Sequence, residues 1–182
     1  VEALAEAVAA AEALEGNIPT AAYQSLAAVV AENNKEYETG DEYTAAINAT
    51  KQATETTKTL QAPYSRYQTI KNAVVAINSG IDTTEPDTQA NAAISVEEIE
   101  AAVLAVRQTL SSYLVDANIE DQEINLTAAL IDNANIGNSG NSNYWTTTAN
   151  PGWQSNLAEF WNKGGASIKQ TISVTLPAGY YI

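Results

Sequence analysis

The chain contains no cysteine, no histidine and no methionine. Without cysteine there can be no disulfide, thiol nucleophile or thiolate metal site. Without histidine there can be no Ser-His-Asp triad, histidine general base or His-ligated zinc. Because methionine is absent, Val1 cannot be the native translation start, and we expect that a signal peptide or a longer chain preceded it.

Basic residues are also scarce. Lysine and arginine number 8 against 22 acidic residues, which gives a net charge of −14 and a pI near 4.1. Such a chain repels phosphate, which argues against nucleic acid and against an anionic membrane as partners. No apolar run approaches the ~20 residues of a transmembrane helix, so the chain is not expected to span a membrane. Hydrophobic residues make up 45% of the 182 positions, which argues against wholesale disorder.

The composition changes near residue 118. Up to that point the chain is rich in Ala, Glu, Gln and Thr, with apolar residues at helical spacing. The remainder is rich in Asn, Ser, Gly and Thr, and it holds all three tryptophans. This shift predicts an α+β multidomain chain with two domains, residues 1–118 and 119–182. The first is expected to be an N-terminal helical bundle of repeated helical hairpins, and the second a C-terminal partial antiparallel β-sandwich.

Local signals predict five helices in the first domain. The expected helices cover residues 2–15, 18–35, 39–60, 63–80 and 95–113. Gly16 ends the first helix, and Thr39-Gly-Asp-Glu42 has the form of a capping box. Ser95 and Glu98 form a second such box, with Ile94 and Ile99 placed as a hydrophobic staple. The polar stretch 82–91 is predicted to be a long loop with at most one helical turn.

Two segments recur along the helical domain. Residues 23–30 match 67–75 with one insertion, and residues 39–49 match 95–105. The pattern predicts a repeated helical hairpin, although any Ala-rich helical pair shows some self-similarity. Residues 18–26 and 95–103 resemble the FIVAR family of bacterial extracellular and cell-wall modules, over roughly residues 1–116. The resemblance implies three-helix modules that act as spacers or adhesive stalks without catalytic residues, although the second copy lacks a clear first helix.

The tail has the pattern of short strands and turns. Residues 124–131 are expected to be extended or to form a short turn leading into an extended segment. Strands are expected at 144–148, 158–161, 167–176 and 180–182, with turns at 151–152, 162–165 (a hairpin) and 176–179. Within 167–176 the side chains alternate between apolar and polar, and Gln170 is a polar exception on the apolar face.

Three phrases in the tail carry a second resemblance. Residues 157–162, 168–172 and 176–181 are similar to the first part of a galactose-binding-like jelly-roll module of the Bacteroides type. The resemblance implies an exported carbohydrate-binding module. A jelly roll needs about eight strands, whereas this chain offers three or four. We therefore expect a fragment of a longer protein, or else strands completed by a neighbour, with the fragment favoured.

Aromatic and amide side chains in the tail are the candidate sugar-binding residues, because aromatic faces stack on sugar rings while amides and carboxylates bond hydroxyls. The candidates are Tyr144, Trp145, Asn150, Trp153, Gln154 and Glu159. The alternative is that Trp145, Phe160 and Trp161 fill a sandwich core.

Catalysis is not expected. The adjacent carboxylates Asp41-Glu42 and Glu97-Glu98 lie at predicted helix N-termini, where they cap rather than react. No cofactor or metal is predicted. Asp132, Asn133, Asn135 and Asn138 are oxygen-rich, but they form no EF-hand loop, and whether a structural calcium binds is left open. The glycosylation patterns at Asn48 and Asn125 are interpreted as chance in a chain of bacterial character.

The sequence thus favours a non-catalytic carbohydrate-binding or adhesion protein, exported to the bacterial surface, with the helices as a stalk. The expected partners are a polysaccharide or glycan and, secondarily, surface proteins; a periplasmic location stays open. One alternative is the accessory region of a larger glycoside hydrolase. Another is a purely structural spacer or protein-adhesion module.

Overall fold

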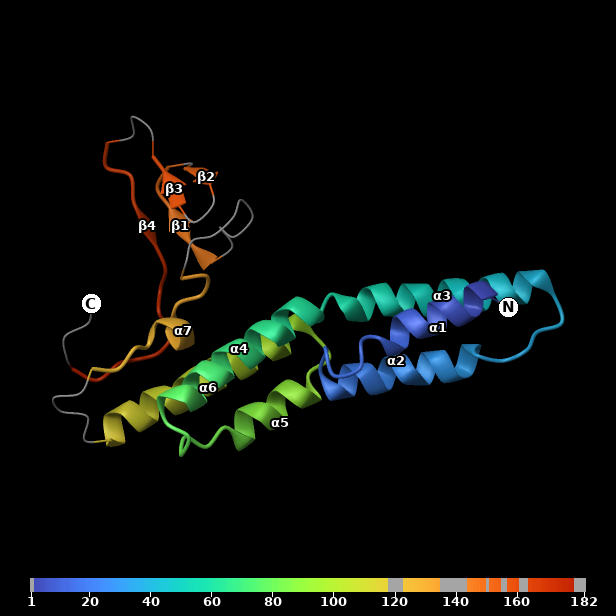
Figure 1. The fold of residues 1–182 in the computed structure, drawn as a ribbon, viewed down its shortest axis with the longest axis horizontal. Coiled ribbons are helices and arrows are strands. Elements are labelled where there is room, and N and C mark those ends of the chain that lie inside the picture. Colours follow the sequence, from blue (N-terminus) through green and yellow to red (C-terminus); the bar gives the residue numbers. More distant parts are fainter. Residues whose placement is uncertain are drawn as a thin grey trace. The chain divides into compact units, whose positions relative to one another are not determined.

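The computed structural model describes residues 2–117, 123–134, 144–149, 151–154, 157–160 and 164–178. Within these residues the protein is mostly helical (Figure 1). Two compact units are present, one of residues 1–71 with 82–106 and the other of residues 72–81 with 107–182. The predicted boundary after residue 118 falls among residues outside the described part, so it stays a prediction.

The first three helices are α1 (Glu2–Glu12), α2 (Thr20–Asn33) and α3 (Gly40–Lys58). Both α1 and α2 pack against α3 (Figure 1). Leu4 and Val8 of α1 are buried against Ala46 of α3, as their helical spacing predicts. Gly16 has φ 73°, the left-handed conformation that glycine adopts without strain, and α1 has ended in a turn before it.

The capping box predicted at Thr39 is confirmed. The Glu42 N–H donates to Thr39 Oγ1 at 3.3 Å, and Glu42 Oε2 accepts from the Thr39 N–H at 3.0 Å. Thr39 Oγ1 also donates to Glu42 Oε2 at 2.9 Å. This bond and the one from the Thr39 N–H lower the pKa of Glu42, because they favour its charged form. The acidic pair Asp41-Glu42 therefore begins a helix, which is the structural role that the sequence favoured.

The next three helices are α4 (Gln61–Ile77), α5 (Thr84–Ala92) and α6 (Val96–Asp116). The prediction of a long loop over residues 82–91 is wrong, because α5 occupies most of it. Its polar sequence hides the helix, yet Pro86 and Ala90 are buried and Asp87 bonds to α4. Residues 61–116 thus hold three helices, as residues 2–58 do. However, α5 lies between the segments that match α2 and α3, so it does not supply the first helix that the second predicted repeat lacks.

The second cap differs from its prediction in one detail. The Glu98 N–H donates to Ser95 Oγ at 3.2 Å, but Glu98 Oε2 accepts from the backbone N–H of Ile94. Ile94 is 63% exposed whereas Ile99 is fully buried, so the predicted hydrophobic staple is wrong. The Glu98 carboxylate thus binds the backbone one residue before Ser95. The Ile94 side chain lines a cleft of about 360 Å³ together with Val96 and Leu60.

A buried hydroxyl in α3 gives the first testable prediction. Thr50 is fully buried, and its Oγ1 has no hydrogen-bond partner among the described residues. Replacing it with the isosteric valine removes an unsatisfied polar atom, so Thr50→Val should raise the free energy of unfolding by about 1 kcal/mol in a denaturant titration. Thr54→Val is the control, because Thr54 Oγ1 donates to the Thr50 carbonyl at 2.8 Å and loses a bond on substitution. A Thr50→Val protein less stable than the parent would contradict this account.

Among its described residues, the tail contains one helical turn and four short strands. The turn is α7 (Thr127–Leu130), within the stretch expected to be extended or a short turn. The strands are β1 (Thr146–Thr147), β2 (Gly152–Gln154), β3 (Leu157–Glu159) and β4 (Ile168–Lys169). They form two antiparallel pairs, β1 with β4 and β2 with β3. A full β-sandwich is not shown in the described residues.

Two predictions for the tail need correction. The hairpin predicted at 162–165 is not seen among the described residues, where β3 and β4 belong to different pairs. Residues 161–163 lie outside the described part. The long strand over 167–176 is reduced to Ile168–Lys169. Alternation selects the face of each side chain, but a strand also needs a hydrogen-bonded partner, and β1 offers one for two residues only.

Candidate functional site

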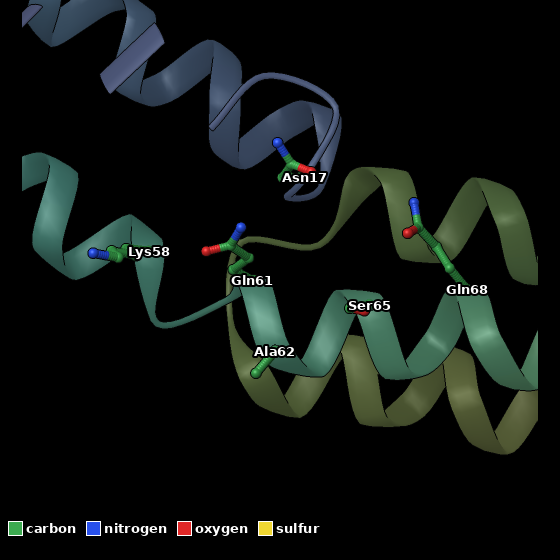
Figure 2. Close-up of a pocket in the computed structure, with 6 residues that line it drawn as sticks. All are labelled: Asn17, Lys58, Gln61, Ala62, Ser65 and Gln68. Atoms are coloured by element: carbon green, nitrogen blue, oxygen red, sulfur yellow. The ribbon is translucent and has the colours of Figure 1, made fainter. Parts of the chain in front are cut away.

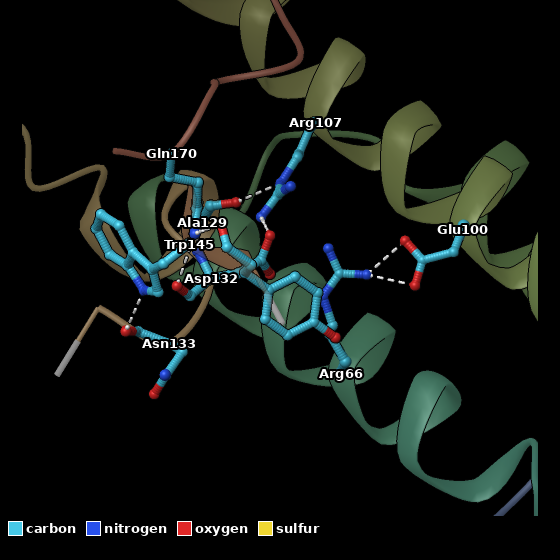
Figure 3. Close-up of polar contacts among 9 residues, drawn as sticks. Arg66, Glu100, Arg107, Ala129, Asp132, Asn133, Trp145 and Gln170 are labelled. Atoms are coloured by element: carbon cyan, nitrogen blue, oxygen red, sulfur yellow. Dashed lines mark hydrogen bonds and ion pairs between the residues drawn. The ribbon is translucent and has the colours of Figure 1, made fainter. Parts of the chain in front are cut away.

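The polar centre of the second unit joins the tail to α6. Arg107, which α6 carries, is only 6% exposed. Its Nη2 lies 3.0 Å from Asp132 Oδ2, and its Nε donates to the carbonyl of Ala129 at 3.0 Å (Figure 3). One planar guanidinium therefore binds both the end of α7 and the residues that follow it, a geometry that lysine could not reproduce.

Gln170 continues this network and explains the polar exception in the apolar face of the tail. Its Oε1 accepts from the Asp132 N–H at 2.8 Å, and its Nε2 donates to the Asp132 carbonyl at 3.0 Å (Figure 3). The same Nε2 also donates to the Tyr144 carbonyl at 3.0 Å. A single amide thus ties three separate stretches of the tail together through their backbone groups.

The aromatic residues beside this network differ in exposure. Trp145 is half-buried, and its Nε1 donates to the Asn133 carbonyl at 3.2 Å (Figure 3). Asn133 lies in the turn after α7 with φ 49°, a left-handed conformation that asparagine tolerates. Tyr144, by contrast, is 40% exposed. Trp145 is thus half-buried and bonded to the backbone of the tail, whereas Tyr144 is the more exposed of the two residues.

The other predicted site residues are less fully defined. Trp153 and Gln154 belong to β2, where Trp153 pairs with Ala158, but their side chains lie outside the described part, as does Asn150. Glu159 ends β3 opposite Gly152, and its side chain is half-buried. The structure thus brings Tyr144 and Trp145 together beside Gln170. Arg107 was not among the predicted site residues. The signal that could have found it is a charged residue on the apolar side of a helix.

A second polar cluster, partly buried, lies in the first unit and joins α5 to α4. The Tyr67 hydroxyl donates to Asp87 Oδ1 at 2.7 Å, Thr83 Oγ1 donates to Asp87 Oδ2 at 3.1 Å, and Lys71 Nζ lies 3.0 Å from the same oxygen. Burial alone would raise the pKa of Asp87, but the bonds from Tyr67, Lys71 and Thr83 and the Lys71 charge lower it. Burial and the Asp87 carboxylate raise the pKa of Tyr67 well above its ordinary value. Both shifts follow from a structural network.

A polar cleft of about 420 Å³ lies in the same unit, between the turn after α1 and the start of α4 (Figure 2). Its lining residues are Asn17, Lys58, Gln61, Ala62, Ser65 and Gln68. Asn17 is already engaged, because its Nδ2 donates to the carbonyls of Ala13 and Glu15. The cleft contains no aromatic side chain, which distinguishes it from the tail as a place for a sugar ring.

Metal and membrane chemistry find no support in the described residues. Across the described ranges, no group of three or more acidic side chains could hold a metal ion, and Asp132 of the oxygen-rich stretch pairs with Arg107. No helix in those ranges has the length and apolar content needed to cross a bilayer. The FIVAR and galactose-binding-like resemblances stay predictions, because comparison of the chain with protein-family models, curated proteins and solved structures gave no match.

Proposed function

We propose that this chain is a non-catalytic glycan-binding or adhesion protein of the bacterial cell surface, with the helices as its scaffold. One observation carries the proposal: Tyr144 is an aromatic residue that is 40% exposed, while its backbone carbonyl is held by Gln170. Ligand sites combine aromatic surface with a few placed polar groups, and an aromatic ring can stack on the apolar face of a sugar.

The support beneath Tyr144 makes it suitable for binding. Gln170 holds the Tyr144 carbonyl and both backbone groups of Asp132, and Asp132 is held in turn by Arg107 of α6. A side chain on a backbone fixed in this way loses less conformational freedom when a ligand binds. The ring is therefore supported by a chain of hydrogen bonds that ends on a helix.

No catalytic step is part of the proposal. Hydrolysis of a glycosidic bond uses two carboxylates placed about 5–10 Å apart across the bond. Glu42 and Glu98 cap helices, and Asp132 and Asp87 belong to ion pairs. These four carboxylates form hydrogen bonds or ion pairs that stabilise the fold, which favours a binding function over a catalytic one.

A glycan-array screen of the intact protein tests the proposal, with Tyr144→Ala as the test variant. Loss of ring stacking should weaken binding to any saccharide hit by about tenfold, equivalent to about 1.4 kcal/mol. Ile172→Ala is the matched control, because Ile172 is 38% exposed in the same unit but offers no aromatic face. The expected result is a hit that survives Ile172→Ala and Tyr144→Trp but not Tyr144→Ala.

Two outcomes of this screen would count against glycan binding. One is the absence of any hit with a folded protein, and the other is equal loss in the Tyr144 and Ile172 variants. Either would favour a structural spacer, the second candidate. That candidate draws support from the first unit, where Thr39 with Glu42, Ser95 with Glu98, and Asp87 with Tyr67 all serve to begin or hold helices.

A further inference from the structure

The two Asn-x-Thr sequences of the chain lie in very different surroundings. Asn125-Leu126-Thr127 precedes and enters the single turn α7, and both Asn125 and Thr127 are exposed. Asn48-Ala49-Thr50 lies inside α3, where Asn48 is exposed but Thr50 is fully buried. Both match the same Asn-x-Thr acceptor pattern, so the difference in accessibility comes from the tertiary structure.

We propose that Asn125 is an acceptor site for N-linked glycosylation and that Asn48 is not. In this reaction Asn125 Nδ2 forms a bond to the anomeric carbon of a lipid-linked oligosaccharyl pyrophosphate. The bond from that carbon to the pyrophosphate oxygen breaks, the lipid pyrophosphate leaves, and Nδ2 loses one proton. The proposal requires export, which is part of the proposed function, but it does not require glycan binding.

The local geometry at Asn125 suits this chemistry. Asn125 Oδ1 accepts from the backbone N–H of Thr127 at 3.0 Å, so the bond uses the side-chain oxygen and does not involve Nδ2. The segment from residue 123 to 126 belongs to neither helix nor strand. A transferase must draw the acceptor into an extended conformation and read the hydroxyl two residues on, and here both side chains are on the surface.

The same chemistry is blocked at Asn48. Reading the Thr50 hydroxyl would require α3 to unwind in its middle, since Thr50 is buried among the packed helices. Unwinding would break consecutive helical hydrogen bonds, including the bond from Thr54 Oγ1 to the Thr50 carbonyl. Of the two asparagines, the folded chain therefore exposes only Asn125 as a usable acceptor. Asn48 serves as a control within the same chain.

The residue two positions before each acceptor asparagine also differs. Exposed Glu123 places a carboxylate two positions before Asn125, whereas Ala46 occupies that position before Asn48. The surroundings of the two asparagines therefore differ in charge as well as in burial. A bacterial enzyme is used as the probe because the proposed function places the chain at a bacterial cell surface.

The test uses the folded, full chain with a purified single-subunit bacterial oligosaccharyltransferase and its lipid-linked oligosaccharide. Intact mass and peptide mapping should show one glycan, located on Asn125. Asn125→Gln and Thr127→Ala should each abolish the addition, Thr127→Ser should preserve it, and Asn48→Gln should leave it unchanged. Circular dichroism of each variant confirms that it is folded, and a short acceptor peptide confirms that the enzyme is active.

An unmodified folded chain in the presence of active enzyme would overturn the proposal. Modification of Asn48 to the same extent as Asn125 would overturn it too. Neither outcome depends on the glycan-array result, because that screen reads binding at Tyr144 by protein that has not been glycosylated. Failure of one proposal therefore leaves the other standing.

Discussion

Replacing Arg107 with methionine is expected to lower the free energy of unfolding by about 3–5 kcal/mol. The substitution leaves the Asp132 carboxylate, whose side chain is 9% exposed, without its guanidinium partner, and it removes the donor to the Ala129 carbonyl. A buried charge stripped of its partner keeps its desolvation cost and loses the attraction that offset it. Guanidinium titration followed by tryptophan fluorescence measures the effect, because all three tryptophans lie in the tail.

Matched variants separate the ion pair from general loss of charge. Lys58 pairs with Glu55 across 4.0 Å, but both side chains are largely exposed, so Lys58→Ala should change stability by no more than about 0.5 kcal/mol. Arg107→Lys should fall between, since it keeps the charge but not the forked geometry. If Arg107→Met shifted the midpoint no further than Lys58→Ala, the proposed role of this pair in anchoring the tail would be untenable.

The second large effect is expected at Asp87. Asp87→Ala should lower the free energy of unfolding by about 2–4 kcal/mol, because it leaves the hydroxyl of Tyr67, which is 2% exposed, without its acceptor. It also breaks the bonds from Lys71 and Thr83 that hold α5 in place. Denaturant titration followed by far-ultraviolet circular dichroism measures the loss of helix.

Two comparisons test the cause of that loss. Glu85→Ala on the same helix is the control, because Glu85 is exposed and should change stability by about 0.5 kcal/mol or less. Adding Tyr67→Phe to Asp87→Ala removes the orphaned hydroxyl and should restore part of the stability. Strict additivity of the two substitutions would argue that the hydroxyl and the carboxylate are not coupled.

The same network predicts a dependence on pH. The pKa of folded Asp87 lies below its ordinary value of 3.8, so its contribution is present above that value and is lost as the pH falls through the folded pKa. Tyr67 behaves in the opposite sense: its raised pKa means that its contribution is complete below its ordinary value of 10.0 and declines at higher pH. The Asp87→Ala protein should therefore lose less stability on acidification than the parent.

Helix positions and caps were predictable because their signals are local. Leu4 and Val8 recur at helical spacing, and Thr39 with Glu42 or Ser95 with Glu98 needs only four consecutive residues. Helix α5 was missed because its polar sequence lacks an apolar stripe and its hold on the fold comes from Asp87 bonding to α4. The exposed Ile94 was missed because the carboxylate of Glu98 engages the backbone one residue earlier than expected.

The candidate site shows the same division. Tyr144 and Trp145 were predicted as ligand residues from their type, but only the structure separates an accessible ring from one bonded to Asn133. The sequence shows Gln170 as a polar residue on an apolar strand face but does not explain it. Its hydrogen-bond partners lie 26 and 38 residues away. No sequence pattern around Arg107 indicates that it pairs with Asp132.

By itself the sequence determined the helical character of residues 2–116 outside α5, the capping residues, the acidic charge and the absence of cysteine and histidine chemistry. These properties depend on composition and on neighbours within about one helical turn. Only the tertiary structure decided how the strands pair, which acceptor asparagine is accessible and how Arg107, Asp132 and Gln170 meet. These features depend on burial and on hydrogen bonds between residues far apart in the sequence. The order of residues along the chain does not reveal which of them lie close together in space.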